Sequence, residues 1–351
     1  MGHEAETGTA TTDLPLTWAA LRQLLGAGFR SAHLTSTARV VLRSRNQLYR
    51  LTLDAAPVDS LVLKLVRTAD DRFWEHHLRR EHWVLELLAR FWPGGAPRPF
   101  AAAFGQEWGL LVMEDVGLVS LAELLGQHRP DDGEALLLPA LQRLAQLHTV
   151  LRGQQRIFQR VCHSAELDRI TAASLLARLR VAHGRLLTAQ QIQASASTPP
   201  PSVLHEYTER VVRPLMRGPR QMIHNSLSPL NVVLGPTARF VDWETMALAA
   251  PEFDIADLLR YPTAAMPWPA VDRMVLAVFG PHLDLVRLRL AALARALDYA
   301  GSNAQQAAQR RIAGDPAHAA LADARRAWYS QEARTLAMEL GLASLADAVV
   351  P

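Results

Sequence analysis

The spacing of apolar residues changes near residue 116, and this change restricts the folds open to the chain. Before it, a helical pattern at 16–28 is followed by three strand-like runs, at 31–42, 47–54 and 60–66. A long helical pattern at 71–91 and two more short strand-like runs, RPFAAAF and GLLVMED, complete this region. Beyond residue 119 the spacing is helical almost to the end. The pattern predicts an α+β protein in which a small antiparallel β-sheet precedes a mainly helical region.

The predicted domains are a β-rich lobe at 1–116, with a flexible start at 1–14, and a helical lobe at 117–351. The length of 351 residues agrees with this division, because domains usually contain about 150 residues. The helical lobe is interrupted at 222–244, where two short strand-like runs predict a β-hairpin that carries polar residues. The Pro-rich stretch 194–202 is interpreted as a surface insertion, since helical patterns resume on both sides of it. This arrangement predicts a bilobal protein with a cleft.

The composition excludes several classes of protein. The chain has 37 Lys and Arg against 34 Asp and Glu, and its basic residues are scattered, so nucleic acid is not an expected partner. No uninterrupted run of about 18 apolar residues is present, so no membrane span is expected. The first residues lack the pattern of a secretory leader, and the single cysteine, Cys162, cannot form an internal disulfide. We expect a soluble, cytoplasmic protein, whose oligomeric state the sequence does not indicate.

One lysine stands apart from the other basic residues. Of the 37 basic residues 36 are arginine, and the only lysine is Lys64. It lies in LVLKLV, a run that predicts a buried strand, where an unpaired ammonium is costly. A compact ammonium binds phosphate as a point charge, whereas the larger guanidinium does not fit the same space. Lys64 is therefore a candidate phosphate-binding residue, and the chance survival of one lysine is the alternative.

Glu81 is the candidate partner of Lys64. On the helix predicted at 71–91, it lies within an apolar stripe, three residues after Leu78 and four before Leu85. A carboxylate there needs a partner unless it lies at the exposed edge of the stripe. The lysine one strand earlier favours a Lys64–Glu81 ion pair over exposure. The histidines of HHLRREH in the same helix are interpreted as a solvated face, because no second cluster of metal ligands accompanies them.

The segment 222–244 reads MIHNSLSPLNVVLGPTARFVDWE and carries polar residues at a distinctive spacing. His224, Asn231 and Asp242 stand at the spacing of His-x-Asp-x-x-x-x-Asn, a short hairpin and then Asp. Asn231 and Asp242 on either side of a hairpin offer hard oxygen ligands to Mg²⁺. Taken singly, Asn231 could be a turn residue and Asp242 a cap at the end of the hairpin. Taken together, the segment resembles the catalytic segment of the aminoglycoside phosphotransferase and choline kinase group of protein-kinase-like enzymes.

The resemblance extends over ordered matches from about residue 15 to 262. Lys64 and Glu81 fall where the family has its phosphate-gripping lysine and its helix glutamate. The run LLVMEDVG, with Met113 and Glu114, resembles the linker between the lobes, which implies that these two residues bind the nucleotide. Asn46 matches an asparagine that is frequent in the family and is a further residue implied to bind the nucleotide. The resemblance implies the bilobal protein-kinase-like fold.

Two further segments resemble the family. LAQLHTVL, with His148, is similar to the family's LxxLH helix. PEFDIADLLRY matches its Pro-x-x-Asp-hydrophobic-Ala segment, and the resemblance implies that Asp254 braces the catalytic loop through backbone N–H groups.

Two departures from the family pattern affect the expected chemistry. The position of the catalytic aspartate, two residues after His224, holds Ser226, and the preceding residue, usually Gly, is Asn225. A serine hydroxyl is no general base at neutral pH, and losing such a base lowers a rate about 10²- to 10⁴-fold. Phosphoryl transfer depends mostly on positioning and electrostatics, so slower chemistry or an already acidic acceptor is compatible with this change. The second departure is the phosphate-covering turn, VVLRSRNQLYRL, which contains no glycine and in which Arg43 and Arg45 could contact phosphate.

The resemblance implies an ATP-dependent phosphotransferase that acts on a hydroxyl of a small molecule, with ATP or another NTP and Mg²⁺. Asn231 and Asp242 would hold Mg²⁺, and Ser226 would occupy the base position, with His224 nearby. The first alternative is a catalytically inactive kinase-like protein, a pseudokinase that binds a nucleotide or a partner, which Ser226 and the glycine-free turn favour. A second is another phosphoryl or nucleotidyl chemistry with its own base, which the sequence does not identify.

Overall fold

The computed structural model describes residues 16–40, 47–67, 72–117, 119–128, 132–161, 170–190, 199–264 and 266–349. Four of the features discussed above lie outside these residues wholly or in large part. They are the start of the chain at 1–14, the turn with Arg43, Arg45 and Asn46, Cys162, and most of the Pro-rich stretch.

The described residues form two compact units of an α+β fold, which confirms the predicted fold class. The first unit contains the residues up to Val119 together with Val233–Thr245, and the second contains Ser120–Val232 and the residues from Met246 onward. The chain therefore leaves the second unit once to complete the first. The domain limits at 116 and 117 stay a prediction.

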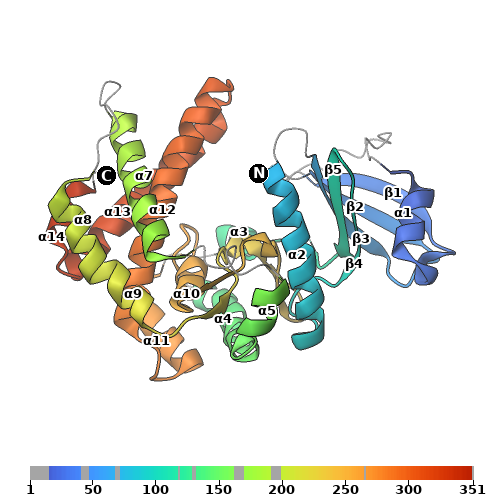
Figure 1. The fold of residues 1–351 in the computed structure, drawn as a ribbon, viewed down its shortest axis with the longest axis horizontal. Coiled ribbons are helices and arrows are strands. Elements are labelled where there is room, and N and C mark those ends of the chain that lie inside the picture. Colours follow the sequence, from blue (N-terminus) through green and yellow to red (C-terminus); the bar gives the residue numbers. More distant parts are fainter. Residues whose placement is uncertain are drawn as a thin grey trace. The chain divides into compact units, whose positions relative to one another are not determined.

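The first unit is built on a five-stranded antiparallel sheet. Its strand order is β1 (His33–Val40), β2 (Gln47–Asp54), β3 (Ser60–Arg67), β5 (Trp108–Glu114) and β4 (Pro99–Phe104). Two helices accompany it, α1 (Trp18–Leu25) and α2 (Arg72–Phe91). A hairpin of β7 (Val232–Leu234) and β8 (Ala238–Phe240) lies at the predicted position. Figure 1 shows α1 and α2 on opposite sides of the sheet.

The alternation of side chains along β3 decides which face Lys64 occupies. Leu61, Leu63 and Leu65 are buried in the apolar cluster that also contains residues of α1. Because successive side chains of a strand point to opposite faces, Lys64 lies on the other face, which α2 covers. The strand pattern seen in the sequence thus directs the one lysine toward the helix that carries Glu81.

The second unit is mainly helical. Its helices are α3 (Leu121–Gln127), α4 (Gly133–Leu151), α5 (Gln155–Val161), α7 (Ala172–Gln190), α8 (Pro201–Tyr207), α9 (Arg213–Arg217), α10 (Glu252–Leu259), α11 (Trp268–Phe279), α12 (Leu285–Ile312), α13 (Pro316–Glu339) and α14 (Ala343–Ala348). The strands β6 (Gln221–Ile223) and β9 (Ala247–Ala249) pair antiparallel. The long helix α12 packs against α7, α10 and α13. Helix α5 and strands β6 and β9 are absent from the sequence prediction, since such short elements carry no clear periodicity.

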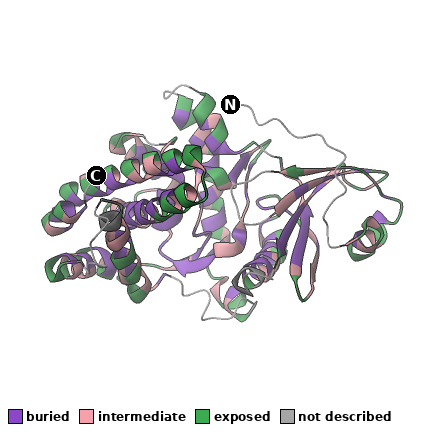
Figure 2. Ribbon diagram, turned by 90° about the horizontal axis from the view of Figure 1, so that it is seen from above, coloured by how far each residue is buried: buried purple, intermediate pink, exposed green. Residues whose placement is uncertain are grey.

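Buried and exposed residues alternate around many of the helices (Figure 2), as is typical of amphipathic helices that cover a core. Between α8 and α9 the helix widens into a π-helical segment at Thr208–Val212. Pro214 follows two residues after this segment, and a proline lacks the N–H of a regular helical turn and crowds the preceding turn. None of the described helices is long and apolar enough to cross a membrane.

The contact between α7 and α12 gives a first prediction. A Cβ added at Gly301 of α12 would lie 2.7 Å from the Ala182 Cα atom of α7, so Gly301→Ala must push the helices apart. We expect it to lower the free energy of unfolding by about 1–3 kcal/mol, measured by urea denaturation. Gly184→Ala on α7 is the control, because a Cβ there meets no atom within 4 Å, and it should be neutral or stabilising. Equal stability of both variants would contradict the close packing.

Candidate functional site

Lys64 lies at the centre of a cluster of carboxylates in the first unit. Its Nζ atom donates hydrogen bonds to Glu81 Oε2 at 2.7 Å, Asp242 Oδ1 at 2.8 Å and Glu244 Oε2 at 2.9 Å. Lys64 and Glu81 are almost completely buried. An ammonium has three N–H donors, so all donors of Lys64 are used by these carboxylates. The charge that the apolar strand has to accommodate is thus compensated within the unit.

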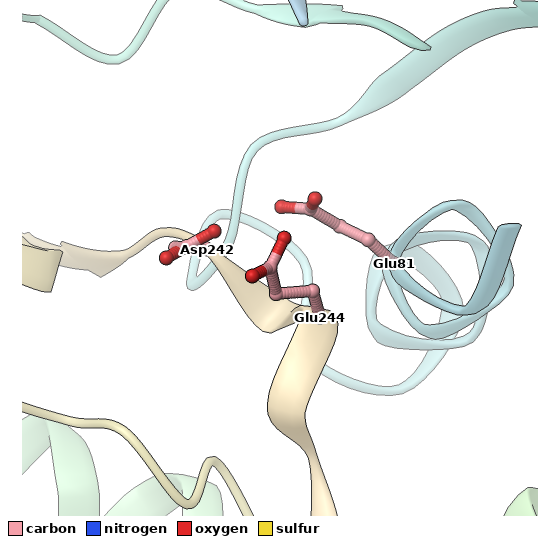
Figure 3. A group of neighbouring side chains, drawn as sticks. All are labelled: Glu81, Asp242 and Glu244. Carbon is pink, nitrogen blue, oxygen red and sulfur yellow. The ribbon is translucent and has the colours of Figure 1, made fainter. Parts of the chain in front are cut away.

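The three carboxylates point toward one another (Figure 3). One comes from α2, and the other two come from the short segment that follows β8. Ligand oxygens of Glu81, Asp242 and Glu244 lie within 4.8 Å of one another, and among the described residues this is the one group that could hold a metal ion. Carboxylate oxygens at such distances suit a hard cation such as Mg²⁺.

The backbone after β8 brings Asp242 and Glu244 to this place. Phe240 at the end of β8 donates its N–H to the Gly95 carbonyl at 2.9 Å. Asp242 then adopts a left-handed conformation, with φ of 65°, which turns the chain sharply and is uncommon for a residue other than glycine. The Trp243 N–H donates to Glu81 Oε1 at 3.2 Å, so Glu81 is bound by both Lys64 and this backbone group. Strain of this kind is typical of functional sites.

The electrostatics of the cluster follow from one ammonium among three carboxylates. Burial, together with the charges of Asp242 and Glu244, raises the pKa of Glu81 to about 7, although the ammonium of Lys64 opposes this rise. Burial alone would lower the pKa of Lys64, but the three carboxylates outweigh it and raise that pKa well above its usual value. Lys64 therefore stays charged at neutral pH, and burial favours the protonated form of Glu81.

Ser226 lies in a separate loop of the second unit, between β6 and a 3₁₀ helix at Pro229–Asn231. Asn231 Nδ2 donates to the Ser226 carbonyl at 2.8 Å. The two preceding residues are bound by Asp254 of α10. Its carboxylate accepts the backbone N–H of His224 at 2.9 Å and that of Asn225 at 2.8 Å. The loop thus has a fixed backbone, and it carries a half-buried serine where the family pattern has a carboxylate.

Asp254 is fully buried, which favours its neutral form. Hydrogen bonds from His148 and from the His224 backbone, together with the charges of both imidazoles, outweigh burial and hold the pKa of Asp254 below its usual value. The His148 Nε2 atom lies 3.2 Å from Asp254 Oδ2. Ionised Asp254 therefore stabilises the fold above the unfolded-state pKa of about 3.9, and this stabilisation disappears as the pH falls through the lower folded-state pKa.

The pH dependence of this stabilisation leads to a second prediction. In Asp254→Asn the amide group turns a donor toward one of the two backbone N–H groups, so we expect the free energy of unfolding at pH 7 to fall by about 2–4 kcal/mol. The difference between wild type and variant should shrink as the pH is lowered below about 4, measured by urea denaturation at several pH values. Asp347→Asn, at an exposed position, is the control. A difference that is constant with pH would show that Asp254 is not ionised in the fold.

The remaining sequence-predicted residues take up different positions. Met113 is a buried residue of β5, and the neighbouring Glu114 forms an ion pair with Arg239 of β8 and accepts the Arg98 N–H at 3.2 Å. His224 is completely buried. Asn46 lies outside the described residues.

Glu244 is a partner of Lys64 that was not predicted from the sequence. Its signal was present, since Glu244 follows Asp242 by two residues in DWE, a spacing that can place two carboxylates side by side on a turn. The pattern does not predict the 3₁₀ helix at Trp243–Thr245. That turn is needed to carry the Glu244 side chain toward α2.

The fold is similar to those of several solved structures of phosphotransferases and of LicA. A crystal structure of the spectinomycin phosphotransferase APH(9)-Ia with ADP and spectinomycin has a TM-score of 0.55 at 12% identity, over 94% of this chain and 99% of that one. A crystal structure of LicA with AMP gives 0.53 at 13% identity, over 88% and 94%. A mutant of the aminoglycoside phosphotransferase APH(4)-Ia with AMP-PNP and hygromycin B gives 0.50 at 15% identity, over 89% and 98%. At such identities the similarity shows the fold, which is protein-kinase-like.

The family follows from the sequence itself. Residues 37–291, well over half of the chain, match the model of the phosphotransferase enzyme family. The chain belongs to this family. The comparison with curated proteins gave no match.

Proposed function

We propose that the protein transfers the terminal phosphoryl group of ATP, or of another NTP, to a hydroxyl of a small molecule. The observation that carries this proposal is the buried ammonium of Lys64, bound by Glu81, Asp242 and Glu244. Membership in the phosphotransferase enzyme family supports it. The names of the similar structures also support it, since they include nucleotides together with the hydroxylated antibiotics spectinomycin and hygromycin B.

In this proposal Lys64 binds the phosphates and Glu81 orients it. Because all three N–H donors of Lys64 are already used, a phosphate oxygen can bind it only by replacing a carboxylate. Glu81 keeps a second bond to the Trp243 N–H and is buried, whereas the Asp242 side chain is 39% exposed. Asp242 is therefore the carboxylate that we expect Lys64 to release.

The carboxylate that Lys64 releases is suited to a divalent cation. The residues fit Mg²⁺, because the cluster supplies several carboxylate oxygens within reach of one ion and carries more negative than positive charge. Asp242 and Asn231 would hold it, and when bound it would neutralise the charge of the phosphates. Met113, Glu114 and Asn46 are proposed to contact the rest of the nucleotide.

Ser226 limits the rate that this site can reach. A serine hydroxyl does not take the proton of an acceptor alcohol at neutral pH. The transition state of phosphoryl transfer is loose and depends mainly on positioning and charge neutralisation, which Lys64 supplies without a base. We therefore propose a slow phosphotransferase, or one whose acceptor is more acidic than an ordinary alcohol.

One second function is favoured by a specific observation. Ser226 in the base position is also compatible with a kinase-like protein that binds a nucleotide without turnover. In either case a small molecule is the proposed ligand, since the scattered arginines of the sequence do not favour nucleic acid. The cytoplasm is the proposed location, since the single cysteine, Cys162, cannot form an internal disulfide.

The deciding experiment is a screen for ATP consumption over hydroxylated metabolites and antibiotics, in the presence of Mg²⁺. We expect consumption above background with at least one acceptor, and none above background with the Lys64→Met variant under the same conditions. Titration of ATP by calorimetry accompanies the screen. If ATP binds with Mg²⁺ but no acceptor raises its consumption, the binding-protein function replaces the phosphotransferase.

A further inference from the structure

The residue directly before Ser226 has an unusual backbone. Asn225 has a φ of 67°, in the left-handed region, and is buried. Asparagine tolerates this region better than other residues except glycine, yet it still needs support from its surroundings. The Asn225 N–H is bound by Asp254, but this bond leaves the carbonyl and the side chain of Asn225 to be fixed by other groups.

Those groups are supplied by α12, seventy positions further along the chain. The Nη2 atom of Arg295 donates to the Asn225 carbonyl at 3.0 Å and to Asn225 Oδ1 at 2.7 Å. One guanidinium nitrogen thus binds both the backbone and the side chain of the same residue. This is possible because position 225 holds an asparagine, whose amide oxygen a glycine does not offer.

Arg295 is itself held rigidly. Its side chain is 7% exposed, its Nε atom lies 3.0 Å from Asp257 Oδ1, and its guanidinium carbon lies 4.8 Å from the centre of the Phe253 ring. Tyr299, one turn further along α12, donates its hydroxyl to Asp257 Oδ1 at 2.9 Å. The planar guanidinium can pair with Asp257 and bind Asn225 at the same time, whereas a lysine ammonium lacks this fixed fork.

We propose that Arg295 is a positioning residue, which fixes the direction of the Ser226 loop by holding Asn225 in its left-handed conformation. The proposal rests on the proposed function, because it assigns Arg295 a part in the same phosphoryl transfer. Without the hydrogen bonds from Arg295 to Asn225, Asp254 remains the main group that binds the loop, and the Ser226 side chain can change its orientation. Lys64 and Asp242 belong to the other unit, whereas Asn231, which donates to the Ser226 carbonyl, lies in this loop.

The test uses Asn225→Gly, which removes the amide oxygen but adopts a positive φ without strain, so the fold should be preserved. We expect kcat to fall about 10- to 100-fold, because Asn231, a proposed ligand of the cation, donates to the Ser226 carbonyl and is misplaced when the loop shifts. Asn225→Asp, which keeps an oxygen for Arg295, should restore most of the rate. Arg178→Gln is the matched control, since it breaks a different ion pair of α12, that with Asp298 at 2.5 Å.

A second readout does not depend on turnover. Amide hydrogen exchange of residues 224–228, followed by mass spectrometry, should become at least about tenfold faster in Asn225→Gly and in Arg295→Gln, and should stay unchanged in Arg178→Gln. Unchanged exchange in Asn225→Gly would overturn the proposal, whether or not the protein is active. If the wild type transfers no phosphate but the exchange changes as expected, the proposed function fails while Arg295 still holds the loop.

Discussion

Asp242→Ala should weaken the binding of Mg²⁺–ATP about 10- to 100-fold while leaving the binding of metal-free ATP equal or tighter. The loss corresponds to one charge-assisted interaction, of about 1.5–3 kcal/mol, between the carboxylate and the cation. The tighter binding of metal-free ATP has a different cause. Asp242 occupies one of the three donors of Lys64, so its removal frees an N–H for phosphate and removes a negative charge nearby.

Calorimetric titration of ATP with Mg²⁺ and with a chelator measures both values. Lys64→Met should weaken binding in both conditions, since its ammonium contacts the phosphates directly. Glu86→Gln, an exposed residue on the same helix as Glu81, is the control and should change neither value. An equal loss for Asp242→Ala with and without metal would mean that Asp242 does not hold the cation.

Ser226→Asp should raise the rate of phosphoryl transfer about 10²- to 10⁴-fold, the range that a general base contributes. The variant places a carboxylate on a loop whose backbone is already fixed, since Asn231 binds the Ser226 carbonyl and Asp254 binds the two preceding N–H groups. The new side chain therefore starts from a defined position. Steady-state kinetics with the best acceptor measure the effect.

The matched control is Ser226→Asn, which has nearly the same shape but cannot accept a proton. We expect it to leave the rate at or below that of the wild type. If Ser226→Asp and Ser226→Asn give the same rate while both bind ATP, the missing base is not what limits this protein. His224 and Glu244 would then be the next residues to replace.

The pairing of Lys64 with Glu81 could be predicted because each residue interrupts a periodic pattern of apolar residues. A charged residue in an apolar strand and a carboxylate in an apolar helical stripe each require a partner, and the chain offers one of each in neighbouring elements. Asp242 could be placed only by its similarity to a known motif. Its approach to Lys64 depends on a left-handed φ, which no apolar pattern encodes.

The contact of Arg295 with Asn225 lies beyond this kind of prediction. Arg295 is one of 36 arginines, and it lies in a helix whose other arginines are interpreted equally well as solvated. Only the packing of α12 against α10 and the loop selects it. Short elements such as β6 and β9 escaped prediction for a related reason, since three residues are too few to establish a period.

The chain order of the first unit has a consequence for synthesis. Residues Val233–Thr245 belong to that unit, and they bring Phe240 and Trp243 against the Trp92 ring at centroid distances of 5.5 and 6.5 Å. A nascent chain that has reached only residue 119 therefore lacks two of the carboxylates around Lys64 and part of the aromatic packing. Folding during translation, which usually completes the amino-terminal domain first, must here wait until Thr245 has left the ribosome.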